Sequence, residues 1–317
     1  MTISPEEIRK LFQTINSQFN KCLEPRMTCK NKAVRAHSVQ NGRVIDLIAK
    51  DGHVIMLRPS FSNEKMDIEF KSVGRNRAST FTGLCNEHDT AIFKPIDTRP
   101  FDRENNEHLF LLAYRSVCRE LHAIMEAAVK NQSVYRSRVE RGVDAADATS
   151  AAGQMATERM IISYETYQYR FNNFDIPLVN GSFDNIEHDI IEIFHPAPML
   201  AVSSLFSFDE LRNVDGVVRV VLNVFPISNS ISLAVFSYAS TDRNMARAAL
   251  DRILNSRDAY QKYELSRLIL NRIENFMISP VHFDTWSAEK ISRIKAAFTN
   301  TIANREQVPD HPDMMLF

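Results

Sequence analysis

The sequence contains few cysteines and no hydrophobic run long enough to cross a membrane. Four cysteines among 317 residues are too few for a small secreted scaffold stapled by disulfides. No stretch approaches the roughly 20 apolar residues that span a bilayer. The first residues, Met1 to Glu7, lack the basic start and apolar core of a signal peptide. We therefore expect a reduced, cytoplasmic location, where cysteines bind metals more often than they cross-link.

Charge of neither sign dominates the whole chain, whose formal net charge is -1. This balance excludes a uniformly basic nucleic-acid coat. The charge is nevertheless uneven, because residues 1–100 hold 16 Lys and Arg against 11 Asp and Glu, and the remainder holds 22 against 28. The basic part suits a phosphate-bearing partner. An excess of this size is also common on domains that bind nothing anionic.

Three of the four cysteines fall in one segment, residues 22–97. Two form a pair, and the third lies three residues before a histidine. Thiolate and imidazole are ligands that zinc prefers, and a tetrahedral structural site needs four of them. The sequence therefore predicts a zinc site with the ligands Cys22, Cys29, Cys85 and His88. The alternative is that these cysteines are ordinary thiols or small core residues.

Hydrophobic periodicity predicts an α+β fold. Predicted helices occupy about residues 4–19, 83–94, 107–139, 145–169, 241–256, 259–277 and 287–303. Predicted strands occupy residues 33–57, broken by turns at Asn41-Gly42 and Asp51-Gly52, and residues 186–194, 199–206, 217–225 and 231–238. Short connections make the last four strands an antiparallel sheet. Residues 59–80 are polar and irregular, so we expect a surface loop there.

The segment 22–97 resembles zinc-stabilised HNH endonucleases of the treble-clef, ββα-metal group. The shared order is a cysteine pair, a strand with Ala36-His37-Ser38-Val39-Gln40, a further β segment, and Cys-x-x-His opening a helix. The resemblance covers about 75 of the 317 residues. It implies that His37 is the general base that activates water, and that Asp89 or Asn86 lies near a catalytic Mg²⁺ or Mn²⁺. Ala36 stands where the family often has one more metal ligand.

The chemistry that this resemblance implies is the hydrolysis of a phosphodiester. The reaction needs a base with a pKa near neutrality, which histidine supplies, and a divalent ion that neutralises the phosphate. Arg35, Arg75 and Arg77 are the expected contacts to the nucleic-acid backbone. Two other roles for His37 remain open, a hydrogen bond to a backbone carbonyl and a place in the zinc site instead of His88.

We expect two domains, a small treble-clef-like zinc module over residues 1–100 and a larger α+β domain over residues 101–317. The second would contain a helical hairpin at 107–170, an antiparallel sheet at 178–238 and C-terminal helices at 241–303. Proteins built this way look like those of bacterial defence systems and mobile elements. The expected function is binding of nucleic acid, DNA more than RNA, with HNH-like cleavage. Residues 101–317 would form homo-oligomers or bind a protein partner.

Two other functions remain open. The chain could be a non-enzymatic, zinc-stabilised interaction or sensor protein, or an enzyme whose site surrounds His195. Glu187, His188 and Asp189 also suggest a metal site. Their alternation with isoleucines favours instead the solvent face of an edge strand.

Overall fold

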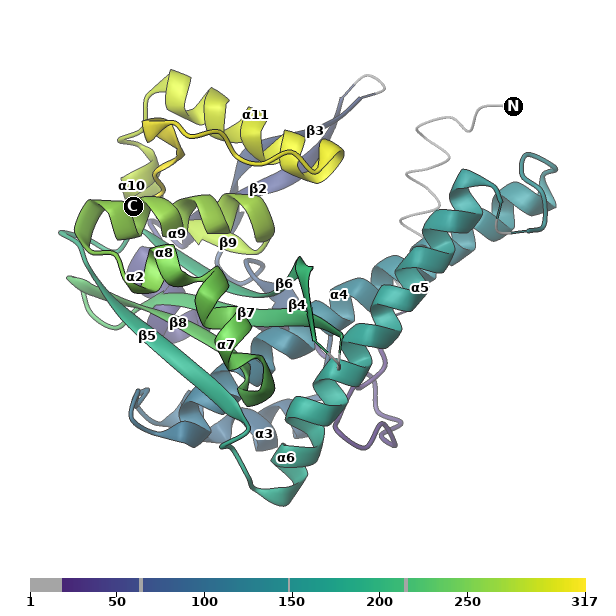
Figure 1. Ribbon diagram of the computed structural model, residues 1–317, viewed down its shortest axis with the longest axis horizontal. Helices are drawn as coiled ribbons and strands as arrows, with labels where there is room; N and C mark the ends of the chain where they lie inside the picture. The colour runs from purple at the N-terminus through teal and green to yellow at the C-terminus, as the bar shows by residue number, and fades with distance from the viewer. Residues whose placement is uncertain (1–18, 63–64, 148, 214–215) are drawn as a thin grey trace. The chain divides into compact units, whose positions relative to one another are not determined.

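The computed structural model describes residues 19–62, 65–147, 149–213 and 216–317. It combines helices with antiparallel sheet (Figure 1), so the predicted α+β class is confirmed. The chain forms two compact units. The first, which we call the knuckle unit, contains the described residues of 19–36, 81–100 and 117–183. The second, which we call the sheet unit, contains those of 37–80, 101–116 and 184–317.

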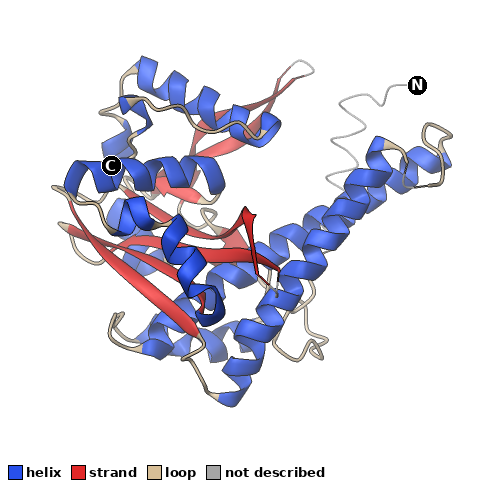
Figure 2. Ribbon diagram, in the orientation of Figure 1, coloured by secondary structure: helices blue, strands red, loops and turns tan. Residues whose placement is uncertain are grey.

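The sheet unit is built on a seven-stranded antiparallel sheet with the strand order β3-β2-β9-β6-β7-β8-β5. Figure 2 shows the strands in red. The strands are β2 (His53–Ser62), β3 (Lys65–Gly74), β5 (Ile186–Phe194), β6 (Leu200–Asn213), β7 (Gly216–Pro226), β8 (Ile231–Ala239) and β9 (Phe276–Ile278). The short strand β9 joins the two halves of the sheet, because Ile278 pairs with Ile55 of β2 and with Leu200 of β6. The β2–β3 hairpin and the later strands therefore form one sheet.

Both faces of this sheet are covered, which explains the nearly continuous apolar runs of its central strands. On β8, Ala234 and Phe236 pack into a core with the C-terminal helices. Leu233 and Val235 pack on the opposite face with Leu109. The alternation follows from the period of two along a strand. The C-terminal helices are α7 (Arg243–Ala249), α8 (Asp251–Leu254), α9 (Asp258–Arg272), α10 (Pro280–Phe283) and α11 (Ala288–Asn304).

A long helical hairpin dominates the knuckle unit. It consists of α4 (Asn106–Glu140), from Val117 onward, and α5 (Ala151–Arg170), as predicted for residues 107–170. The Ser150 hydroxyl caps α5 by accepting the amide of Gly153 at 3.1 Å. Two short helical segments, Phe171–Asp175 and α6 (Ile176–Asn180), follow α5. No helix among the described residues is long and apolar enough to cross a membrane, and α4 is no exception.

The metal-ligand segment contributes its own small elements. Strands β1 (Ala36–His37) and β4 (Thr80–Phe81) pair as a separate two-stranded sheet, and α3 (Asn86–Thr98) follows β4. Between β1 and β2 the chain forms a π-helical turn (Asn41–Ile45) and the short helix α2 (Asp46–Ile48). The order along the chain is therefore loop, strand, insertion, strand and helix.

Two predictions for the insertion are wrong. Residues 44–48 were expected to be a strand, but they are helical, with Val44, Ile45 and Ile48 buried together against the sheet. Residues 59–80 were expected to be a loop, but most of them belong to the β2–β3 hairpin. The β3 sequence alternates Ile68 and Phe70 with charged residues, and these two apolar side chains pack on the core. Their weak period-two signal is what the prediction missed.

Three further predictions differ in their boundaries or fall outside the described residues. The helix that opens after Cys85 was expected to end near Pro95, but α3 contains Pro95 and continues to Thr98. The predicted N-terminal helix at residues 4–19 lies outside the described residues, apart from its last residue. The compact units also divide the chain differently from the expected boundary at residue 100. Pairing between β2 and β9 places the hairpin of residues 53–74 in the same unit as the C-terminal strands.

Candidate metal centre

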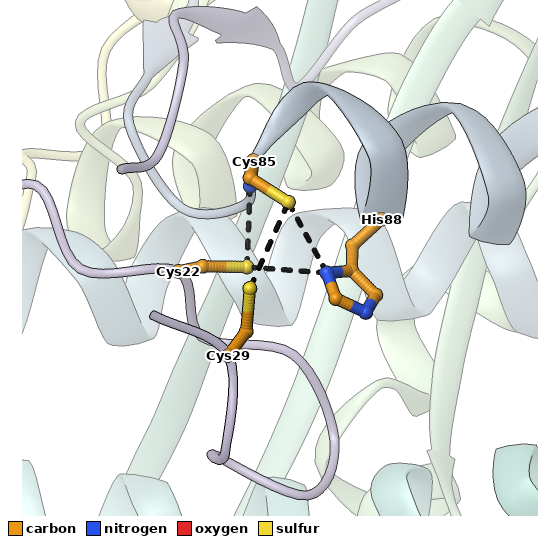
Figure 3. A group of neighbouring side chains, drawn as sticks. All are labelled: Cys22, Cys29, Cys85 and His88. Carbon is orange, nitrogen blue, oxygen red and sulfur yellow. Dashed lines mark hydrogen bonds between the residues drawn. The ribbon is translucent and has the colours of Figure 1, made fainter. Parts of the chain in front are cut away.

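The structure brings the four predicted zinc ligands together within the knuckle unit. Their ligand atoms, three sulfurs and one ring nitrogen, all lie within 4.8 Å of one another. Figure 3 shows the three sulfurs facing Nδ1 of His88, with Nε2 directed away. The separations are 3.1 Å from Cys85 Sγ to His88 Nδ1, 3.6 Å from Cys22 Sγ to the same nitrogen, and 4.0 Å from Cys29 Sγ to Cys85 Sγ.

These separations match those of a tetrahedral metal site. With metal–sulfur bonds of about 2.3 Å and metal–nitrogen bonds of about 2.0 Å, tetrahedral geometry places neighbouring ligand atoms roughly 3.5–3.8 Å apart. The measured distances bracket these values. The cluster can therefore hold a metal ion such as zinc with little movement of the backbone. No fifth group is needed, because four protein ligands complete a structural site.

Each ligand pair has its own backbone support. Cys85 is the N-cap residue of α3 and His88 lies in its first turn, so one helix start presents both side chains. Cys22 and Cys29 flank a turn that we call the knuckle loop, residues 22–29. The amide of Cys85 also donates to Cys22 Sγ at 3.2 Å, which ties the loop to the helix. An amide that donates to a ligating sulfur stabilises its negative charge.

Glu24 shapes the knuckle loop from inside. Its carboxylate accepts the amides of Arg26 at 2.8 Å and of Thr28 and Cys29 at 2.5 Å and 3.0 Å. Glu24 is 4% exposed, so these hydrogen bonds are shielded from water. Burial by itself raises the pKa of the Glu24 carboxyl, but the three amides outweigh burial and lower it. The loop is therefore preformed around an ionised carboxylate.

Two backbone hydrogen bonds hold the knuckle loop and the segment that follows it beside residues 83–84, which lead from β4 into α3. The amide of Leu23 donates to the carbonyl of Gly83, and that of Val34 donates to the carbonyl of Leu84, both at 2.8 Å. A Cβ at Gly83 would lie 2.4 Å from the ring of Phe81, so a larger residue there would force the ring or the backbone to move. Glycine at this position therefore suits the close approach of the two ligand pairs.

The two buried cysteines differ in acidity. Burial raises the pKa of the Cys22 thiol to about 12. Burial also opposes ionisation of Cys85, but hydrogen bonds from the backbone and ring of His88 and contacts with Cys22 and Cys29 lower its pKa to about 7. Of these two thiols, Cys85 is therefore the first to ionise. A bound cation would displace the remaining thiol protons, since the metal ligand is the thiolate.

The other predicted site residues are divided between the units. His37 belongs to the sheet unit and Asp89 to the knuckle unit, so their catalytic pairing stays a prediction. His37 Nε2 lies 3.1 Å from the carbonyl oxygen of Arg75, which is one of the roles left open by the sequence. Arg75 forms an ion pair with Asp46 in the sheet unit.

The remaining residues named in the sequence analysis do not belong to the metal cluster and lie on the surface, in the core or at the sheet edge. Arg35, in the knuckle unit, and Arg77, in the sheet unit, are exposed. Cys118 is fully buried on α4 and belongs to the core. His195 is buried with Nε2 2.7 Å from the Ser232 hydroxyl. The strand β5 that carries Glu187 and Asp189 lies at the edge of the sheet, and these two acids pair with Arg243 and Arg247.

The sequence did not reveal two groups of residues around the metal centre. One is Glu24, whose role depends on amides two to five residues away. The signal that could have found it is an acidic residue between the two cysteines of the Cys-x6-Cys turn. The other is a set of exposed cations around the knuckle loop, which we call the loop cations: Lys21, Arg26, Lys30, Lys32 and Arg35. Their density was visible in the sequence, but their exposure was not.

Comparison with known proteins found no relative. No family model matches the chain, and neither curated proteins nor solved structures gave a match.

Proposed function

We propose that this protein is a zinc protein whose knuckle loop, β1–β4 pair and α3 form a treble-clef-like module that binds nucleic acid, DNA in preference to RNA. The observation that carries the proposal is the Cys₃His cluster, which joins the knuckle loop to the first turn of α3. Three thiolates and one imidazole favour zinc over magnesium or calcium, which take oxygen ligands. The four-ligand set also matches a structural zinc site better than a catalytic one.

The order of the elements supports the treble-clef-like part of the proposal. A cysteine-bearing loop is followed by β1, its partner β4 and then a helix that carries the second ligand pair. The HNH endonucleases that the sequence resembles have their elements in the same order. The insertion of residues 38–79 between the paired strands is long, and it supplies the β2–β3 hairpin to the sheet unit.

We further propose HNH-like phosphodiester cleavage with His37 as general base, since a specific observation favours it. His37 ends β1, and a carbonyl oxygen can only accept, so Nε2 donates to Arg75 and leaves the lone pair on Nδ1. Burial lowers the pKa of His37, which keeps the ring neutral and able to accept a proton at neutral pH. The resemblance to HNH endonucleases, and not the geometry, suggests Asp89 as a ligand of a Mg²⁺ or Mn²⁺ ion that would neutralise the phosphate.

Two experiments test these proposals separately. Binding of a fluorescently labelled duplex of mixed sequence, with single-stranded RNA as competitor, tests the nucleic-acid part. Plasmid cleavage with Mg²⁺ or Mn²⁺ tests the hydrolysis. His37→Ala should abolish cleavage while duplex binding persists. His53→Ala is the matched control, because His53 is an exposed histidine of the same unit whose ring Nδ1 lies 2.8 Å from the nearby carbonyl oxygen of Asp51.

The outcomes assign the function. Binding without cleavage, or cleavage that His37→Ala does not change, removes the nuclease and leaves a zinc-stabilised binding protein. Zinc without binding to either nucleic acid contradicts the proposed function and favours the interaction or sensor protein that the sequence left open.

A further inference from the structure

The knuckle unit exposes a concentrated positive charge beside the metal centre. The five loop cations all lie within residues 21–35, and every one of their side chains is exposed. The only acid in that stretch is Glu24, which is buried and held by backbone amides. Among the described residues, none of the five forms an ion pair with an acidic side chain at 4.0 Å or less.

Two of these cations are forced together by the fold. Lys21 and Lys32 are partners in an antiparallel β-bridge, and the amide of Ala33 donates to the carbonyl of Asn20 at 2.6 Å next to it. Partners directly opposite each other in such a bridge project their side chains to the same face. Like charges in this arrangement repel each other and destabilise the pair. The fold thus tolerates a local repulsion that an anion between the two ammonium groups would remove.

The negative charge of the metal site is too small to neutralise the loop cations. A zinc ion with three thiolates and a neutral imidazole carries one net negative charge, and the Glu24 carboxylate carries another. Counting only residues 21–35 and the metal site, five cations leave three positive charges unbalanced. A solvated cation cluster with no acidic partners is the surface expected for a polyanion, whose regularly spaced phosphates can meet several cations at once.

We propose that the loop cations, with Lys21 and Lys32 at the centre, are the surface that binds the phosphate backbone of nucleic acid. This rests on the proposed function and adds the place and the mode of contact. Lysine and arginine side chains on an exposed loop reach phosphates without reading bases. Binding through this surface is therefore independent of sequence and strongly weakened by salt. The metal centre fixes the loop that carries the cations, so removing the metal removes the surface.

The test measures duplex affinity over a range of salt concentrations. For wild type, the logarithm of the binding constant should fall linearly with the logarithm of salt concentration. Lys21→Gln with Lys32→Gln should make this negative slope shallower by roughly 1.8, about 0.9 for each lost phosphate contact. The same variant should weaken binding about tenfold or more at 0.1 M salt. Arg26→Gln with Lys30→Gln should make the slope shallower by the same amount.

A matched control separates this surface from net charge alone. Arg252→Gln with Arg257→Gln removes the same two charges from exposed positions of the sheet unit, and it should leave affinity and slope at wild-type values. Zinc content equal to wild type verifies that each variant keeps its knuckle loop. A wild-type protein that binds duplex while both loop variants bind as tightly, with unchanged slopes, overturns the surface and leaves the proposed function standing. A control variant that weakens binding equally also overturns it.

The remaining outcome concerns the partner itself. A wild-type protein that binds neither duplex DNA nor single-stranded RNA overturns the proposed function and this surface together. Binding to vesicles rich in phosphatidylserine in the absence of nucleic-acid binding would identify a different anionic partner and contradict the proposal.

Discussion

Arg170 and Asp175 form an ion pair that is completely excluded from solvent, with Arg170 Nη2 3.0 Å from Asp175 Oδ2 and side chains that are 0% and 1% exposed. The same guanidinium nitrogen lies 3.8 Å from the Met27 sulfur in the knuckle loop. The end of the helical hairpin thus packs against the turn between Cys22 and Cys29. Met27 itself has a positive φ of 56°, a left-handed conformation that needs support from its surroundings.

Arg170→Leu should therefore be strongly destabilising. It leaves the Asp175 carboxylate buried without its partner, and breaking a buried pair in this way costs about 3–5 kcal/mol. Chemical denaturation measures the loss. The double variant Arg170→Met with Asp175→Leu removes both charges, and it should recover much of the stability. Arg138→Leu breaks a partly exposed pair with Asp144 on the same hairpin, and a loss as large as that of Arg170→Leu would contradict the role of burial.

Glu24→Gln should weaken metal binding while the four ligands remain in place. The amide side chain offers one acceptor oxygen where the carboxylate offers two, so the knuckle loop loses amide contacts. Groups that orient metal ligands typically contribute 10–100-fold to affinity. Competition with a zinc chelator measures the change. Glu87→Gln removes the same charge from an exposed position in the first turn of α3, and equal weakening in both variants would contradict the scaffold role of Glu24.

The sheet unit should lose stability in acid through His188. Burial lowers the pKa of His188 to about 4, against an ordinary value near 6.5, although the nearby Asp189 charge opposes the shift. Between pH 6.5 and 4, His188 is therefore protonated in the unfolded chain but neutral in the folded chain. Stability rises with pH wherever the unfolded state holds more protons, so this contribution is lost as pH falls from about 6.5 toward 4. The loss approaches about 3 kcal/mol at the lower limit.

The variant His188→Gln tests this pH dependence, because a glutamine can still bond to Ser237 but does not titrate. Unfolding free energies should be measured between pH 4 and 7 for both proteins. The difference between wild type and variant should change with pH by on the order of 2–3 kcal/mol. A constant difference across this range would show that His188 does not titrate as its burial requires.

The sequence was informative where a residue type carries its own chemistry. Cysteine and histidine at Cys22, Cys29, Cys85 and His88 predicted the cluster because few other roles suit such a set. Local signals also gave the helical hairpin and the four long strands of residues 186–239, whose patterns are strongly periodic.

What the sequence could not give depends on contacts between distant residues. The β2–β3 hairpin joins the sheet through β9, more than 200 residues later, and no local pattern encodes that pairing. Strand pairing at such a distance also explains why the units are not separated by a single boundary at residue 100. The burial of Arg170 was hidden for a different reason. An arginine near a helix end is usually solvated, and Asp175, only five residues away, gives no local sign that the pair is shielded from water.

The cysteines provide the most direct test of the account, because Cys85 and Cys118 are both buried and only one belongs to the metal cluster. The measurement is the metal content of the purified protein by mass spectrometry, with wild type beside Cys85→Ser and Cys118→Ala. We predict one zinc per chain in wild type and in Cys118→Ala. Cys85→Ser should lose the metal and unfold the knuckle unit, because metal binding contributes directly to its folding. Wild-type protein that purifies without a metal and folds equally well with a chelator present would contradict the account.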